Sequence, residues 1–138
     1  MHIHPIATHK ITVKDQNLFA ILDTYVSAFD DRTILVMTSK IVSICEGRVV
    51  KLGTVDKHTL IAQEADAFIP AALNKYHTTL TITQDMLIPT AGIDESNGDG
   101  YYVLWPRDSQ QTANAVRAYL QRRFGHTHVG GIITDSKW

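Results

Sequence analysis

The sequence predicts a mixed α/β (α+β) domain in which short strands alternate with about three helices, and three observations lead to this class. Residues 33–37 form a continuous apolar run, which is typical of a strand buried on both faces of a sheet. Residues 78–83 alternate threonine with apolar side chains, as a half-buried strand does. After Asp108, apolar residues recur at helical spacing. The length of 138 residues, 44% of them hydrophobic, suits a single domain over residues 1–138.

Spacing and turn residues predict the elements of the first half. Residues 3–6 are expected to form an edge strand. Apolar side chains recur every three or four positions over residues 18–29, which indicates a helix, and Asp15 is placed to cap it. The buried strand at residues 33–37 is followed by a mixed polar and apolar segment at 38–47, a short strand at 49–50 and a helix over 56–67.

The second half opens with a hairpin. Its strands are residues 78–83 and 86–88, and the polar pair at residues 84–85 is the turn between them. A glycine-rich loop follows, and the strand resumes at residues 101–104 until Pro106 stops it, because proline lacks the backbone N–H that a strand needs.

The clearest helix of the chain comes next. Asp108 stands three residues before Gln111, as in a capping box, and Gly125 ends the apolar helical pattern. A last strand, HVGGIITD, then places Asp135 at its carboxyl end. The sequence contains no internal repeat, no low-complexity segment and no evident linker.

Charge and composition exclude several classes of partner. Thirteen basic and fourteen acidic residues give a net charge of -1, so nothing indicates a nucleic-acid or anionic membrane surface. No apolar run is long enough to span a bilayer, and the first ten residues do not resemble a signal peptide. The lone Cys45 forms no internal disulfide and fits a reducing compartment. We therefore expect a cytoplasmic protein that acts on small molecules.

Two acidic residues stand where ligands commonly bind. The chain has no phosphate-binding P-loop, no dinucleotide fingerprint, and no HExxH or GxSxG motif. Asp94 lies in a loop behind Gly92, and Asp135 lies where a strand ends, the edge at which open α/β sheets place ligands. Two carboxylates brought together would favour a shared divalent cation such as Mg²⁺ or Mn²⁺. The alternative is that each caps its own turn.

Histidine pairs offer a second kind of candidate metal site. His2 and His4, and likewise His126 and His128, alternate on one face of an expected strand. Such a pair needs at least a third ligand to hold a transition metal. The alternative is that these side chains are exposed on edge strands.

Four segments, in order, carry a resemblance to a known family. They are ILVMTSKIVSICEGRVV, AGIDESN, WPRDSQQTANAVRAYL and VGGIITDS. Together they resemble the amino-terminal half of the coenzyme F-420:gamma-glutamyl ligase family, including bacterial relatives linked to folate metabolism. The resemblance implies a gamma-glutamyl ligase-like fold.

The resemblance implies an acid–amino-acid ligase that consumes a nucleoside triphosphate. GTP would be the co-substrate, Mg²⁺ or Mn²⁺ the metal, with potassium as a further ion, and L-glutamate would be joined to a deazaflavin or folate-like acceptor. The family forms homodimers, so the resemblance implies a homodimer or an association with a missing carboxyl-terminal half.

The resemblance also assigns residues to roles, though no catalytic residue. The metal-binding positions are Asp94, Asp135 and Ser136. The nucleotide-binding positions are Thr38, Ser39 and Asn97, with the adjacent Lys40 placed to reach a phosphate.

The chain departs from the family pattern at several places. Ile44 stands where the family usually has a lysine, and Thr90 stands where it usually has asparagine. Ala7 and Thr8 replace an early Glu-Gly pair, and the glycine- and arginine-containing segment that follows the last motif in the family is not in this sequence. Three hypotheses therefore stay open: a fragment or split part of a ligase, a non-catalytic nucleotide/metal-binding or assembly module derived from that fold, and an unrelated small-molecule-binding domain.

Overall fold

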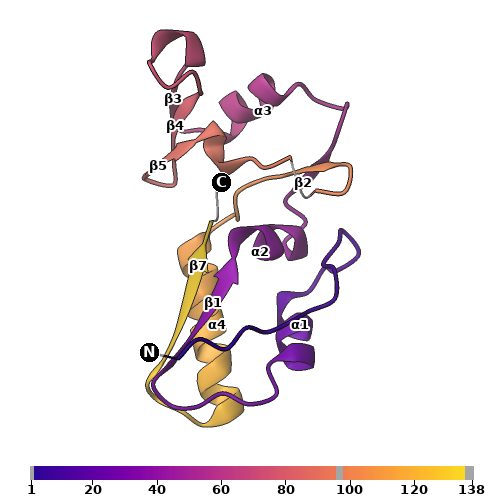
Figure 1. The fold of residues 1–138 in the computed structure, drawn as a ribbon, viewed down its shortest axis with the longest axis vertical. Coiled ribbons are helices and arrows are strands. Elements are labelled where there is room, and N and C mark those ends of the chain that lie inside the picture. Colours follow the sequence, from indigo (N-terminus) through magenta and orange to yellow (C-terminus); the bar gives the residue numbers. More distant parts are fainter. Residues whose placement is uncertain (1, 96–97, 136–138) are drawn as a thin grey trace. The chain divides into compact units, whose positions relative to one another are not determined.

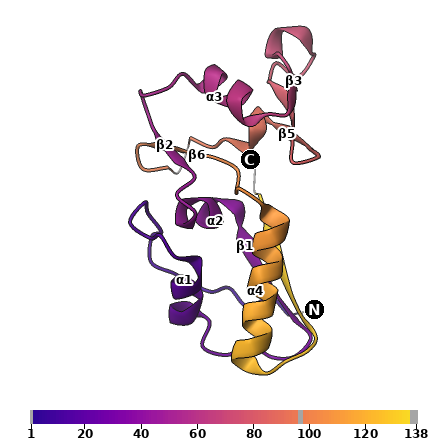
Figure 2. The same cartoon turned by 180° about the vertical axis from the view of Figure 1, so that it is seen from behind.

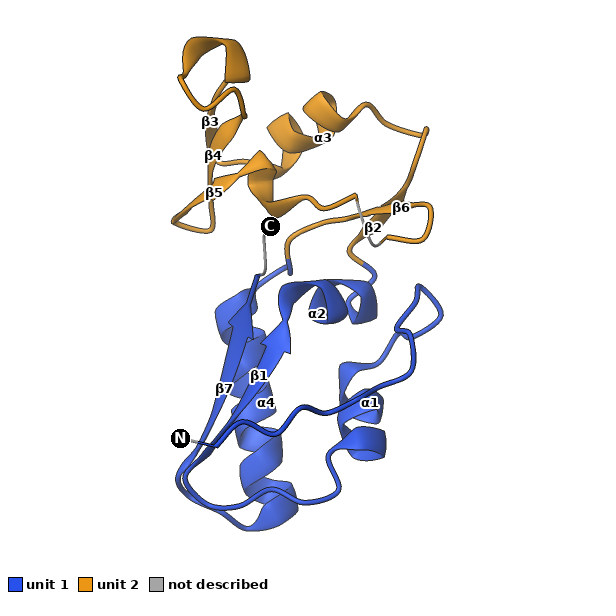
Figure 3. Ribbon diagram, in the orientation of Figure 1, with its two compact units in different colours: residues 1–47, 106–138 blue, residues 48–105 orange. Residues whose placement is uncertain are grey.

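The computed structural model describes residues 2–95 and 98–135 (Figure 1). The chain divides into two compact units: unit 1 is built from Met1–Gly47 and Pro106–Trp138, and unit 2 is Arg48–Trp105 (Figure 3). The described residues form four α-helices and several short strands, which confirms a mixed α/β class. The expectation of a single domain stays a prediction. No helix in the described ranges is both long and apolar enough to cross a membrane.

Unit 1 is a two-stranded parallel sheet with helices packed against it. Its elements are α1 (Leu18–Tyr25), β1 (Thr33–Thr38), α2 (Ser39–Cys45), α4 (Ser109–Phe124) and β7 (Val129–Thr134). The register of β1 and β7 runs from Thr33 beside Val129 to Thr38 beside Thr134. Viewed from behind, α4 lies along the strands (Figure 2). The helix comes so close that a Cβ on Gly131 would lie 3.2 Å from the carbonyl oxygen of Ala113.

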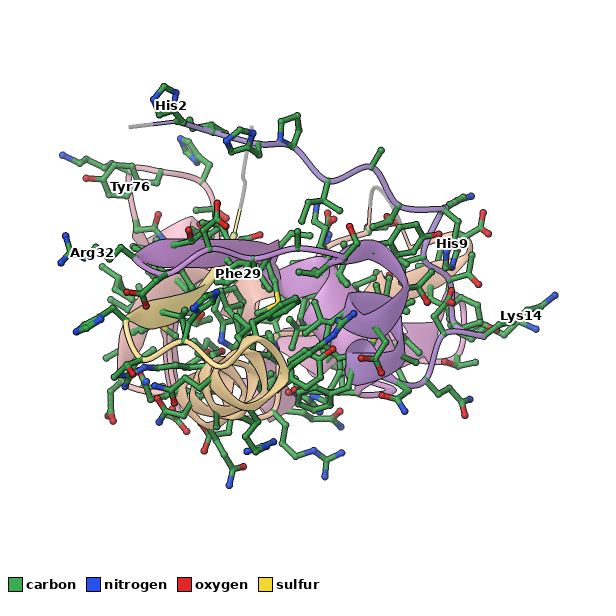
Figure 4. All side chains as sticks on the ribbon, turned by 90° about the horizontal axis from the view of Figure 1, so that it is seen from below. His2, His9, Lys14, Phe29, Arg32 and Tyr76 are labelled. Atoms are coloured by element: carbon green, nitrogen blue, oxygen red, sulfur yellow. The ribbon has the colours of Figure 1, made fainter. Side chains whose placement is uncertain are left out.

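The core of unit 1 joins all of these elements. Leu120 and Val116 of α4 are fully buried. The ring of Phe29, which Figure 4 labels, lies 5.9 Å from that of Phe124 at the end of α4. The other buried members come from α1, β1, α2 and β7 and the segment after α1: Leu18, Leu22, Val26, Leu35, Met37, Val42, Cys45 and Val129.

One strand prediction in unit 1 is wrong in its burial. Leu35 and Met37 of β1 are buried, but Ile34 and Val36 are 56% and 59% exposed. Since neighbouring residues of a strand point to opposite faces, β1 is buried on one face only. The physical reason is that helices of unit 1 cover a single face of its two strands. The apolar run therefore marks a half-buried strand.

Four further predictions in unit 1 are corrected by the structure. Residues 2–10, all of them described, form no edge strand. The cap of α1 is Asn17, whose side chain accepts the N–H groups of Phe19 and Ala20, and the helix ends at Tyr25. Asp15 instead accepts the backbone N–H of Thr12 at 2.8 Å. The fourth correction is α2, which forms within the segment predicted only as a polar and apolar mixture.

The predicted long helix is confirmed as α4. Asp108 caps it by accepting the N–H of Gln111 at 2.9 Å, and Gly125 ends it with a left-handed φ of 72°.

Unit 2 contains two small antiparallel sheets. One pairs β2 (Val49–Lys51) with β6 (Tyr101–Val103), and the other has the order β3 (Ala67–Ile69), β4 (Leu80–Thr83), β5 (Met86–Pro89). Helix α3 (Lys57–Glu64) and two short turns of 3-10 helix, η1 (Ala71–Leu73) and η2 (Thr90–Gly92), complete the unit.

The predicted hairpin of unit 2 is confirmed. Gln84 and Asp85 join β4 to β5 with φ of 52° and 60°, the values of a two-residue hairpin turn whose twist matches the strands. Helix α3 is shorter than the predicted helix over residues 56–67, because it ends at Glu64 and the chain then forms β3.

Candidate functional site

The candidate site in unit 1 lies at the carboxyl edge of the β1–β7 sheet. Parallel strands end at the same edge, and the pairing of Thr38 with Thr134 brings the ends of β1 and β7 together. Ser39 follows directly after β1 and begins α2, while Asp135 follows directly after β7. This is the kind of edge at which open α/β sheets bind their ligands.

Ser39 and Asp135 meet at this edge although 96 positions separate them in the chain. The Ser39 hydroxyl donates to Oδ1 of Asp135 over 3.4 Å, a long hydrogen bond. Ser39 is 4% exposed, whereas Asp135 is half-buried. The edge therefore presents a carboxylate and a hydroxyl, both of them oxygen donors.

Helix α2 carries the remaining residues of this edge. Lys40 is half-buried in the first turn of α2. It follows Ser39 directly in the sequence, and its side chain carries a positive charge. One turn further along, Ile44 is 8% exposed. A buried apolar side chain therefore occupies the position where the resemblance predicts a lysine. The lysine of α2 is instead Lys40, which follows Ser39.

Ser43, also in α2, has a fully buried hydroxyl that finds no hydrogen-bond partner among the described residues. An unsatisfied buried hydroxyl costs about 1–3 kcal/mol. We find no role for it at the candidate edge.

The second candidate position, Asp94, belongs to unit 2. Its backbone forms a two-way bridge with Val103, in which each residue donates its N–H to the other's carbonyl at 2.9 and 2.8 Å. The side chain is half-buried. The bridge fixes the backbone of Asp94 beside β6, so the position of its Cα is well defined.

The turn that leads to Asp94 has an unusual backbone. Thr90, Ala91 and Gly92 have φ of 54°, 51° and 70°, three consecutive residues in the left-handed region. Such a φ is rare for a β-branched residue such as Thr90 and stores roughly 1–3 kcal/mol of strain. Backbone strain of this kind concentrates at binding and active sites.

Glu95, next to Asp94, forms an ion pair within unit 2. Its carboxylate lies 3.0 Å from Nζ of Lys57 at the start of α3. The pair therefore ties this acidic loop to the first turn of α3.

The structure thus brings together four of the seven predicted residues. Thr38, Ser39, Lys40 and Asp135 gather at one edge of unit 1. Asp94 lies in the other unit, so its predicted pairing with Asp135 stays a prediction. Asn97 and Ser136 lie outside the described residues. The contact between Ser39 and Asp135 was not predicted, although both residues stand where a strand ends.

The histidines give no sign of a metal site. Within residues 2–95 and 98–135, no three side chains of histidine, cysteine, aspartate or glutamate gather as a metal would require. His128 instead binds Asp31, with Nδ1 lying 3.1 Å from Oδ2 and the backbone N–H donating to Oδ1 at 2.9 Å. That backbone hydrogen bond holds the pKa of the Asp31 carboxyl below its ordinary value.

The chemistry of the unit 1 edge suits a hard divalent cation. Carboxylate and hydroxyl oxygens, as in Asp135 and Ser39, are the donors that Mg²⁺ and Mn²⁺ prefer. Mg²⁺ is usually held by one or two carboxylates together with substrate phosphates, so Asp135 is a sufficient starting point for such a site.

Comparison with known families supplies the last finding. A family model described as F420-0:Gamma-glutamyl ligase matches residues 5–138, which is nearly the entire chain.

Proposed function

The chain belongs to the F420-0:Gamma-glutamyl ligase family, and on this premise we propose that it takes part in GTP-dependent amide-bond formation between a substrate carboxylate and L-glutamate. The observation that carries the proposal is the meeting of Ser39 with Asp135 at the carboxyl edge of β1 and β7. A hydroxyl can donate a hydrogen bond to a nucleotide phosphate, and a carboxylate can hold the divalent cation that binds the phosphates.

The proposed reaction has two steps. A carboxylate oxygen of the acceptor attacks the terminal phosphorus of GTP, which forms an acyl phosphate and releases GDP. The amine of L-glutamate then attacks the acyl carbon, phosphate leaves with the former carboxylate oxygen, and the amine loses a proton. The first step activates a poor electrophile, and it depends mainly on positioning and on neutralising charge.

Each predicted residue has a place in this scheme. Thr38, Ser39 and Lys40 would contact the nucleotide, and the cation of Lys40 would offset phosphate charge. Asp135 and Asp94 would hold a divalent cation, which when bound neutralises the phosphate oxygens. Asn97 on the nucleotide, Ser136 on the metal, and potassium as a further ion complete the proposal.

The proposed partners follow from the same premise. The acceptor is a deazaflavin of the coenzyme F-420 type or a folate-like molecule, and the working form is a homodimer or an assembly with a carboxyl-terminal half. We also propose a cytoplasmic location, which the buried and unpaired thiol of Cys45 supports.

Calorimetric titration of GTP in the presence of Mn²⁺ tests the proposal. We expect Asp135→Asn to weaken GTP binding at least tenfold, because a metal ligand is lost, and Ser39→Ala to weaken it less. Asp30→Asn is the matched control, since Asp30 is an exposed aspartate of the same unit that lies away from this edge. Unchanged binding in Asp135→Asn, or an equal loss in Asp30→Asn, would refute the site.

A second candidate function is a non-catalytic nucleotide- and metal-binding or assembly module. The observation that favours it is Ile44, a buried apolar residue at the position where the family usually has a lysine. The two candidates differ in turnover. A ligase releases GDP when glutamate and an acceptor are added, whereas a binding module takes up GTP and Mn²⁺ without producing GDP.

A further inference from the structure

A second group of polar side chains in unit 1 lies outside the candidate site. His9 belongs to the amino-terminal segment, Asp15 to the segment before α1, and Tyr25 is the last residue of α1. Nε2 of His9 lies 2.9 Å from Oδ1 of Asp15, and Nδ1 of His9 lies 2.6 Å from the hydroxyl oxygen of Tyr25. The backbone N–H of His9 donates to the same hydroxyl oxygen at 3.0 Å. One imidazole ring therefore joins a carboxylate to a phenol.

The chemistry of these groups determines which of them donate hydrogen bonds. Asp15 accepts the backbone N–H of Thr12 at 2.8 Å, and this hydrogen bond, followed by that with His9, lowers the pKa of its carboxyl. The carboxylate is therefore ionised at neutral pH and only accepts, so Nε2 of His9 carries the ring proton. In the neutral ring Nδ1 is then an acceptor, and the Tyr25 hydroxyl donates to it.

This order of groups is the one that activates a nucleophile. In such sites a hydroxyl or thiol is hydrogen-bonded to a base, and a third group orients the base. Here Tyr25 stands in the place of the nucleophile, His9 in that of the base and Asp15 in that of the orienting group. After the proton moves to Nδ1, the phenolate oxygen accepts from both Nδ1–H and the backbone N–H of His9. The arrangement therefore stabilises the ion that the proton transfer creates.

We propose that Tyr25 is a nucleophile that accepts an acyl group from an activated carboxylic acid such as an aryl ester, with His9 as its general base and Asp15 as a positioning residue. The Tyr25 oxygen attacks the acyl carbon and forms a new ester bond. The bond from that carbon to the leaving oxygen breaks, and its electron pair goes to the leaving group. The phenol proton passes to Nδ1 of His9 and from there to the leaving oxygen. This step is balanced without an oxidant or a nucleotide, so the proposal does not depend on the proposed ligase activity.

The exposure of the three side chains suits this role. The His9 side chain, which Figure 4 labels, is 48% exposed, while that of Asp15 is 18% exposed and Tyr25 is half-buried. The carboxylate is better shielded from water than the ring, and shielding strengthens its hydrogen bond to Nε2. The alternative is that these hydrogen bonds only fasten the amino-terminal segment to α1. Reactivity separates the two, because fastening does not need a base.

Acetylation of the full chain by p-nitrophenyl acetate, followed residue by residue with peptide mass spectrometry, tests the proposal. The reference is Tyr76, which is 63% exposed and so meets the reagent more readily than the half-buried Tyr25. A positioned general base contributes about 10²–10⁴-fold to a rate, so we expect Tyr25 to be acetylated about a hundredfold faster than Tyr76. Tyr119 reports on folding: burial raises the pKa of its phenol, and its hydroxyl donates to Asp23, so it reacts slowly while the chain is folded.

Matched variants separate the roles of the three residues. His9→Gln keeps a hydrogen-bonding side chain but removes the base, so the rate at Tyr25 should fall about a hundredfold. Asp15→Asn allows the tautomer in which Nδ1 carries the proton and cannot accept, and should cause a similar loss, whereas Asp15→Glu keeps the carboxylate and should retain more of the rate. His128→Gln is the control, because Nδ1 of His128 also lies 3.1 Å from an aspartate, Asp31, in the same unit. It should leave the rate unchanged.

Added imidazole gives a measurement that a purely structural role would not change. In His9→Ala, imidazole in solution should raise the rate at Tyr25 relative to Tyr76 in the same sample, since it supplies the missing base. The ratio cancels any general reaction of imidazole with the reagent. The same addition should not raise this ratio in the unmodified chain.

Each outcome decides the question. A Tyr25 that is acetylated no faster than Tyr76 would overturn the proposal and leave only the fastening of the amino-terminal segment. An unchanged ratio in His9→Gln, or an equal loss in His128→Gln, would overturn it as well. Circular dichroism and a slow Tyr119 check that each variant is folded. Loss of GTP binding with a fast Tyr25 would count against the proposed function alone, since the two measurements share no ligand.

Discussion

Replacing Gly92 with alanine should destabilise unit 2 more than the same change at any open glycine. Gly92 has φ of 70°, and a Cβ there would lie 2.6 Å from Cε3 of Trp105. Carbon atoms pack at about 3.5–4.0 Å, so the methyl group and the ring cannot both keep their places. Trp105 is 7% exposed, so its ring has little room to move, and its carbonyl accepts the Nε–H of Arg48 at 3.1 Å, which fixes its backbone.

Two contributions make up the expected cost. The left-handed backbone alone costs an alanine about 1–2 kcal/mol. Overpacking against a buried ring adds about 1–3 kcal/mol. Gly100 separates the two contributions, because it has φ of 90° in the same unit and no atom lies within 4 Å of the place that an alanine Cβ would take. We therefore expect a cost of about 1–2 kcal/mol for Gly100→Ala and of about 2–5 kcal/mol for Gly92→Ala.

Urea unfolding followed by circular dichroism measures both variants. The slope of the free energy of unfolding with urea should stay constant, so that the shift in midpoint reports stability. Equal midpoints for Gly92→Ala and Gly100→Ala would show that Trp105 yields without cost, and the steric argument would then be refuted. A larger loss for Gly100→Ala would contradict the packing of this loop altogether.

Two further predictions concern backbone strain and a titrating carboxyl. Thr90→Asn should raise the free energy of unfolding by about 1 kcal/mol, because asparagine tolerates a φ of 54° better than a β-branched residue does; no gain in the urea midpoint would contradict this. The hydrogen bond from the backbone N–H of Thr12 lowers the pKa of the Asp15 carboxyl from its ordinary 3.8, and the hydrogen bond with the His9 side chain lowers it further. The ionised carboxylate therefore stabilises the fold above about pH 4, and this contribution is lost as the pH falls through the lowered pKa. Asp15→Asn should therefore lower the thermal midpoint at about pH 6, and this loss should shrink as the pH falls below about 4, measured against Asp30→Asn. A loss that does not change with pH would argue against the linkage.

Local sequence signals were sufficient to predict an element where residues at its two ends mark its start and its end. Asp108 and Gly125 mark the ends of α4, and the polar pair Gln84 and Asp85 marks the hairpin turn. Helix α2 has no such signal: Thr38 makes no side-chain cap, and the helix carries the buried serines Ser39 and Ser43. Its conformation depends on packing in unit 1 rather than on propensity.

Burial could not be predicted in the same way. The apolar run of β1 is compatible with one covered face or two, because periodicity says nothing of how many layers surround a strand. The three-stranded sheet of unit 2 is a sharper case, since alternation of threonine and apolar residues predicts a half-buried strand without saying which face is inside. The turn that hydrogen-bonds Thr81 places the threonines inside.

The same distinction between local pattern and long-range packing applies to the candidate site. Local pattern and motif order are enough to identify the family, the class of fold and the residue types at the ends of β1 and β7. Long-range packing was needed to show that Ser39 meets Asp135 and that Ile44 is buried. Contacts between residues 96 positions apart follow from strand pairing and register, and a linear pattern does not specify which strands pair.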